Sequence, residues 1–216
     1  MDLQAYIIFC VEIMGTVAFA ASGAMTGISR RMDAFGVCVL GVVTAVGGGM
    51  MRDVILGNVP GALTRPVYVA VAVATALLIF AVLYVKKDLL QGNFGHLYDR
   101  AMLAMDSVGL GIFTAVGVTT GIRNGYLENT FLLTFLGTLT GVGGGLLRDM
   151  MAGVPPYIFV KHIYACASVA GALICVLIYR GFGQIAAVVI SSLIVVLIRC
   201  LAARYRWNLP HIEPEG

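Results

Sequence analysis

Apolar residues run along the chain in long blocks, and short polar connections separate the blocks. A helix needs about 20 apolar residues to cross the hydrocarbon core of a bilayer, and each block has roughly this length. The pattern therefore predicts an all-α integral membrane protein with seven transmembrane helices. The spans are expected near residues 5–28, 34–59, 66–85, 101–122, 127–154, 158–179 and 184–203.

One stretch within these blocks occurs twice. Residues 47–53 read GGGMMRD and residues 143–149 read GGGLLRD, an offset of 96 positions (143 − 47). Each glycine costs a helix interior about 1 kcal/mol relative to alanine, so three in a row predict broken helices in the second and fifth spans. Broken helices in both halves of a membrane chain are typical of a substrate or ion site. The expected pore and gating residues are Gly47, Gly48, Gly49, Arg52, Asp53, Gly143, Gly144, Gly145, Arg148 and Asp149.

The first and fourth spans also repeat. Glu12 aligns with Asp106, and glycines follow both at matching positions, at an offset of 94 (106 − 12). Residues 5–85 and 101–179 are therefore expected to form two three-helix repeats, and residues 184–203 add a seventh helix. Because three crossings is an odd number, the second repeat is predicted to enter the membrane inverted relative to the first.

Lysine and arginine residues are distributed unevenly between the two sides of this topology. Cytoplasmic loops of membrane proteins carry the excess of these residues. The side that holds the C-terminus collects Arg30, Arg31, Lys86, Lys87, Arg100, Lys161, Arg204 and Arg206, whereas the other side has Arg65, Arg123 and Arg180. The N-terminus is thus expected outside and the tail, residues 204–216, in the cytoplasm. With no organelle address in the sequence, the expected location is the plasma (inner) membrane of a prokaryote.

The composition argues against several functions. The chain is 60% hydrophobic and 12% charged, against about 25% charged in a soluble domain. A net charge of +3 gives no indication of a nucleic-acid partner. The five cysteines and three histidines are scattered, without the spacing of a disulfide framework or a zinc site. No catalytic motif is present, so we expect neither an enzyme nor a cofactor, and no metal beyond a transient monovalent cation.

Further polar residues lie near the repeated motif. Thr44 and Thr140 precede the glycines, and Glu12 and Asp106 lie near the starts of equivalent spans. These four are candidates for lining the pore or its mouth, where an acid concentrates cations. Alternatively, the two acids stabilise helix starts through the helix dipole.

The charged pairs allow two interpretations. Adjacent helical residues do not face each other, so the inverted repeat favours the cross-pairs Arg52–Asp149 and Arg148–Asp53. Alternatively, Arg52 lies close to the membrane interface and extends its side chain to water. The glycine spacings 23/27 and 117/121 indicate close helix packing rather than a site.

The doubled Gly-Gly-Gly-x-x-Arg-Asp motif in a seven-span inverted repeat resembles the prokaryotic trimeric intracellular cation channel family, some members of which are called glycine transporters. The resemblance covers about residues 12–203. It implies a homotrimer in membrane lipid, with a pore through each protomer beside second and fifth helices kinked at the glycines. It also implies permeation of monovalent cations, potassium or sodium, chiefly potassium. Animal relatives bind a phosphoinositide through a Lys-Glu-Val motif; residues 52–54 here are Arg-Asp-Val, so such control is not expected.

Three functions remain open. The first is a potassium-permeable channel. The second is a secondary transporter of glycine or another small amino acid, because the arginines beside the glycines fit a carboxylate at least as well as a cation. The third is a structural or regulatory membrane protein without flux. The family resemblance favours the channel.

Overall fold

The structure is a computed structural model, and it describes residues 3–85, 94–160, 163–205 and 207. Its elements are α1 (Leu3–Ser29), α2 (Ala34–Ile55), α3 (Gly61–Thr64), α4 (Val67–Val85), α5 (Phe94–Arg123), α6 (Thr130–Met151), α7 (Tyr157–Val160) and α8 (Ala165–Tyr205). Most of the expected tail, together with Lys86, Lys87 and Lys161 of the charge distribution, lies outside the described residues.

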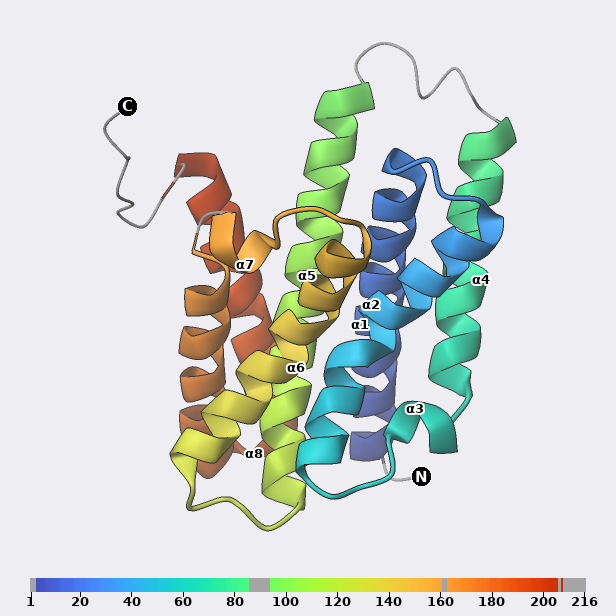
Figure 1. The fold of residues 1–216 in the computed structure, drawn as a ribbon. Helices are drawn as coiled ribbons and strands as arrows, with labels where there is room; N and C mark the ends of the chain where they lie inside the picture. Colours follow the sequence, from blue (N-terminus) through green and yellow to red (C-terminus); the bar gives the residue numbers. More distant parts are fainter. Residues whose placement is uncertain (1–2, 86–93, 161–162, 206, 208–216) are drawn as a thin grey trace.

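Within the described residues, six helices are long and apolar enough to cross a membrane: α1, α2, α4, α5, α6 and α8. They run roughly along one axis, with α2 and α6 oblique to the others (Figure 1). The start of α1 and α3 lie at one end of the bundle, which we term the N-terminal face. The other end carries α7 and the end of α8 and is termed the C-terminal face. The described part of the chain is thus an all-helical, multi-pass membrane protein.

The longest helix, α8, folds back on itself. Gly183 has non-helical dihedral angles (φ 79°, ψ −175°), which only glycine adopts readily. A methyl group added at Gly171 would lie 2.1 Å from the side chain of Val195, so the two arms pack side by side. These arms correspond to the expected sixth and seventh spans, and Figure 1 shows them as an antiparallel pair.

The expected breaks in the second and fifth spans are wrong. α2 is helical from Ala34 to Ile55 and α6 from Thr130 to Met151, in each case through the triple glycine. Low helix propensity is a weak preference that tertiary packing overrides. The glycines therefore have another role, which the contact between α2 and α6 reveals.

At that contact the two backbones approach each other directly. A methyl group at Gly48 would lie 2.2 Å from the carbonyl oxygen of Thr140, and one at Gly144 would lie 2.1 Å from the carbonyl oxygen of Thr44. Distances below 3.0 Å do not occur for real side chains, so only glycine fits at either position. The repeat thus places a glycine of each helix against the backbone of the other, and we term this contact the crossing.

The GxxxG glycines act in the same way between neighbouring helices. A methyl group at Gly23 of α1 would lie 2.6 Å from the Thr44 hydroxyl, and one at Gly117 of α5 would lie 2.6 Å from the Thr140 hydroxyl. The predicted packing role of these spacings is confirmed. The equal distances also show that the α1–α2 and α5–α6 contacts are built alike.

The ends of α2 and α6 match as well. Asp33 caps α2 by accepting the Gly36 N–H at 2.7 Å, and Asn129 caps α6 by accepting the Leu132 N–H at 3.0 Å. Because Asn129 provides this cap, α6 begins at Thr130 rather than near residue 127 as expected. α5 begins earlier than expected and takes in part of the polar connection between the halves.

We expect Gly48→Ala and Gly144→Ala to destabilise the protein by about 1–3 kcal/mol, because overpacking forces the two backbones apart. Gly49→Ala is the matched control: its methyl group would meet only Arg52 Nη2, at 3.7 Å. That variant should keep its stability or gain up to about 1 kcal/mol from helix propensity. Thermal unfolding in detergent measures all three, and equal behaviour would contradict the packing role.

Candidate functional site

In the first Arg–Asp pair, at the end of α2, the two neighbouring residues bind each other. Arg52 donates from Nε and Nη2 to Asp53 Oδ1, at 2.8 and 2.6 Å. The other carboxylate oxygen accepts the Gly61 N–H at 2.8 Å, at the start of α3. The side chains are 12% and 8% exposed, so the pair joins α2 to α3 while remaining in contact with solvent.

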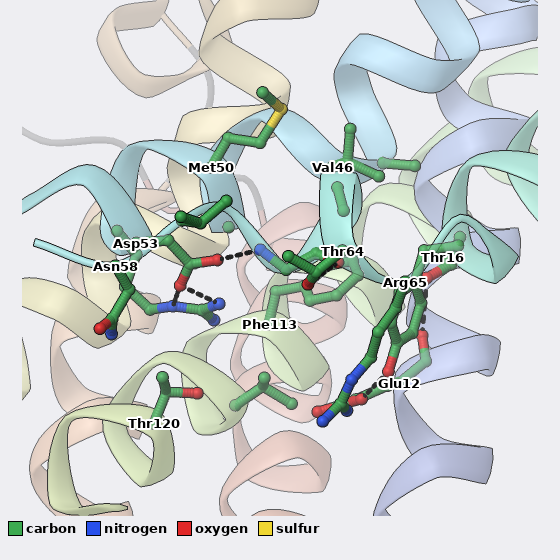
Figure 2. Close-up of a pocket in the computed structure, with 18 of the residues that line it drawn as sticks. Glu12, Thr16, Val46, Met50, Asp53, Asn58, Thr64, Arg65, Phe113 and Thr120 are labelled. Atoms are coloured by element: carbon green, nitrogen blue, oxygen red, sulfur yellow. Dashed lines mark hydrogen bonds and ion pairs between the residues drawn. The ribbon is translucent and has the colours of Figure 1, made fainter. Parts of the chain in front are cut away.

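A cavity of about 560 Å³ opens beside this pair, and we term it the vestibule. Its charged and aromatic lining includes Glu12, Arg52, Asp53, Arg65, Tyr68 and Arg123. In Figure 2, Asp53 lies at one end of the cavity and Glu12, beside Arg65, at the other. Glu12 accepts a hydrogen bond from the Tyr68 hydroxyl. The vestibule is therefore lined by apolar and polar side chains together, and it carries charges of both signs.

The second Arg–Asp pair lies in the opposite environment. Arg148 donates from Nε to Asp149 Oδ1 at 2.8 Å and from Nη1 to Asp106 Oδ1 at 2.7 Å. Nη1 also donates to the Ser22 hydroxyl, and the second oxygen of Asp149 accepts the Tyr157 N–H at 2.9 Å. Arg148, Asp149 and Asp106 are at most 1% exposed. This arginine cluster thus holds three charged side chains in the protein interior.

Tyr164, which directly precedes α8, and Arg199 of α8 add two more side chains to the arginine cluster. Arg199 Nη2 lies 3.9 Å from Asp106 Oδ2, and its guanidinium stacks over the Tyr164 ring at 4.6 Å. The Tyr164 hydroxyl donates to Asp106 Oδ1 at 3.4 Å. Two arginines therefore face two aspartates, and the buried formal charges balance, as a low-dielectric interior requires.

The cross-pairs expected from the inverted repeat are wrong. Each arginine pairs with the aspartate that follows it, and in both pairs the arginine Nε donates to the aspartate Oδ1 at 2.8 Å. The ends of α2 and α6 also lie at opposite faces of the bundle (Figure 1), so the two pairs do not meet.

The predicted site residues fall into three places along the bundle. Gly49, Arg52, Asp53 and Glu12 lie at the vestibule, and Gly145, Arg148, Asp149 and Asp106 lie at the arginine cluster. Gly47, Gly48, Gly143, Gly144, Thr44 and Thr140 lie at the crossing between them. The two threonine hydroxyls donate within their own helices, to the carbonyl oxygens four residues earlier, at 2.6 Å.

The structure adds residues that the sequence did not single out. Arg65 and Arg123 complete the vestibule, and Tyr164 and Arg199 complete the arginine cluster. One signal was available: Tyr68 and Tyr164 are 96 positions apart (164 − 68), the offset of the glycine motif. Within the described part of the chain, no group of three or more His, Cys, Asp or Glu side chains could hold a metal ion.

Three comparisons with known proteins agree with this architecture. A family profile described as "Glycine transporter" matches residues 9–84 and 103–180. A UPF0126 membrane protein of Deinococcus radiodurans is 36% identical over 203 residues, which cover 93% of this chain and 89% of the relative.

Solved structures of channels share the fold. A prokaryotic TRIC channel crystallised in 0.5 M KCl is 28% identical with a TM-score of 0.85, and the match covers 95% of this chain and 100% of that one. The TRIC trimeric intracellular cation channel orthologue from Rhodobacter sphaeroides is 27% identical with a TM-score of 0.81, covering 93% and 98%.

A double-mutant cycle tests the arginine cluster. Asp106→Asn and Arg148→Gln should each cost about 3–5 kcal/mol, because each leaves a buried charge uncompensated. The double variant should cost less than the sum, with a coupling energy of about 0.5–3 kcal/mol. Arg148→Gln combined with Asp53→Asn is the control and should be additive within about 0.5 kcal/mol. Additivity of the first pair in thermal unfolding would contradict the observed ion pair.

Proposed function

Because the chain belongs to the glycine transporter family and shares its fold with the prokaryotic trimeric intracellular cation channels, we propose that it is a monovalent-cation channel permeable to potassium. The observation that carries the proposal is the match to solved TRIC channels over more than nine-tenths of the chain. Those structural neighbours are channels rather than enzymes.

The proposed pore runs through each protomer, from the vestibule past the crossing to the arginine cluster. Buried hydroxyl groups on the central helices support this path: Thr16, Ser22 and Thr26 on α1, and Ser107, Thr114 and Thr119 on α5. Such groups can replace part of the hydration shell of a passing ion. The arginine cluster closes the path in this state, because Arg148 is fully buried.

We place the channel as a homotrimer in a bacterial inner membrane, with the N-terminal face outside and the C-terminal face in the cytoplasm. A structural neighbour is named as trimeric, and the family relatives are membrane proteins. In α4 only Ala72 and Ala76 are buried. The rest of this apolar helix offers a surface to lipid or to another protomer.

Transport of a small amino acid is the second candidate, and the charges of the vestibule favour it. Arg52, Arg65 and Arg123 line the cavity against two carboxylates, those of Glu12 and Asp53. Asp53 is already engaged by Arg52 and by a backbone N–H. A zwitterion could place its carboxylate near the remaining arginines and its ammonium group near Glu12.

Recording in planar bilayers separates the two functions. In a potassium gradient, the purified protein should give unitary current steps that reverse near the potassium equilibrium potential. Silence at all voltages, together with saturable glycine uptake into liposomes made from the same preparation, would reject the channel and support the transporter.

The vestibule should also set the conductance at low salt. Arg123→Gln removes a positive charge from the proposed ion entrance, so the single-channel potassium conductance should rise, by about twofold, in dilute salt. The increase should disappear near 1 M salt, where the Debye length is about 3 Å. Arg180→Gln is the matched control, because Arg180 is exposed and lies outside the vestibule lining. Equal effects of both changes would contradict an entrance at the vestibule.

A further inference from the structure

The vestibule and the arginine cluster are built from equivalent residues. Glu12 corresponds to Asp106 at an offset of 94 (106 − 12). Arg52, Asp53 and Tyr68 correspond to Arg148, Asp149 and Tyr164 at an offset of 96 (148 − 52). Each set gathers one acid from a central helix, one Arg–Asp pair from the end of a crossing helix, and one tyrosine.

The Arg–Asp pairs have the same local geometry. In each, the arginine Nε donates to the aspartate Oδ1 at 2.8 Å. In each, the second aspartate oxygen accepts a backbone N–H eight residues further on, at 2.8 Å in the first half and 2.9 Å in the second. The helix ends match too, since Gly57 and Gly153 both have positive φ (71° and 64°).

The surroundings of the two pairs differ in one consistent way. Arg148 reaches across to Asp106, whereas the equivalent acid Glu12 accepts from Tyr68 instead. A methyl group at Gly145 would lie 2.8 Å from the Tyr164 hydroxyl, whereas at Gly49 only Arg52 Nη2 comes within 4 Å. The equivalent side chains are thus close together at the C-terminal face, which we term the contracted arrangement. At the N-terminal face they lie around a cavity, which we term the expanded arrangement.

We infer that the protein has a second conformation in which the two halves exchange these arrangements. Arg52 then bridges Asp53 and Glu12, with Tyr68 closing over Gly49, and the vestibule is shut. Arg148 releases Asp106, and an equivalent cavity opens at the C-terminal face. Inverted repeats allow this exchange because each half already contains the residues that the other half uses. Under the proposed channel function the exchange relates two closed states, and conduction needs a further state with both ends open.

Two side chains without an equivalent explain why the present state is the one observed. Ser22, which accepts from Arg148, corresponds to Val116 at an offset of 94 (116 − 22), and Val116 lines the vestibule without a polar group. Arg199 belongs to the second arm of α8, which lies outside the repeat, and it pairs with Asp106. Both side chains stabilise the contracted arrangement at the C-terminal face only.

Thiol labelling in detergent tests the exchange without any flux measurement. The five native cysteines are replaced by alanine, and a single reporter is introduced as Thr120→Cys in the vestibule or as its equivalent, Thr26→Cys, which is 5% exposed in the wild type. A charged methanethiosulfonate reagent then reports the reaction rate at each site. We expect rapid labelling at position 120 and slow labelling at position 26.

Arg199→Gln should shift the equilibrium toward the second conformation. If that conformation is a minor state of a few per cent, labelling at position 26 should accelerate about tenfold, while labelling at position 120 falls to about half. Arg204→Gln is the matched control: the same change on the same helix, at an exposed position outside the arginine cluster. It should leave both rates unchanged.

Val116→Ser provides an independent test if Arg199→Gln fails to fold. It offers Arg52 the hydroxyl group that Ser22 offers Arg148, so it should produce the same reciprocal change in rates.

Acceleration at position 26 with no loss at position 120 would mean that the path opens at both ends together, and it would overturn the exchange. Unchanged rates in both variants would overturn it as well. Because labelling is independent of current, a protein that conducts potassium without reciprocal labelling rejects only this inference.

Discussion

The contact between the backbones of α2 and α6 determines where everything else in the site lies. Gly48 and Gly144 let each helix touch the carbonyl of a threonine on the other, so no side chain separates them. Each arginine follows its crossing glycine by four residues, about 6 Å along the helix. The two Arg–Asp pairs are therefore held on either side of one fixed contact, and each faces a different end of the bundle. A larger residue at the crossing would move both pairs at once.

Burial then makes two equal motifs chemically different. The Arg52 pair borders a cavity, where water screens its charge and the charges of nearby arginines. The Arg148 pair is buried, where a lone charge would be costly, so it persists only because two arginines meet two aspartates. The difference arises from the neighbours of each motif, since the motifs themselves match in geometry.

The sequence predicted an all-helical membrane protein and the close packing of the GxxxG glycines, because these depend on local patterns. Sequence-based prediction failed where contacts between residues far apart in the chain determine the structure. The triple glycines suggested a break, since helix propensity takes account of a single helix only. In the structure, α6 packs directly against Gly48, and this contact favours an unbroken α2. Arg199 was not singled out, because nothing in the sequence places the second arm of α8 beside Asp106. The cross-pairs failed because a repeat gives equivalence between residues but not the distance between them.

Under the proposed function, these features locate the barrier to an ion. Two unit charges 4 Å apart repel by about 4 kcal/mol at an effective dielectric constant of 20, so a cation approaching an uncompensated Arg148 would be strongly disfavoured. Asp106 and Asp149 offset that repulsion, which leaves steric closure and loss of hydration as the main obstacles. A cation can therefore pass only when Arg148 leaves one of its carboxylates while the vestibule stays open, and that carboxylate then becomes available to the ion. The same ion pair that stabilises the buried end of the protomer would thus also set the frequency of permeation.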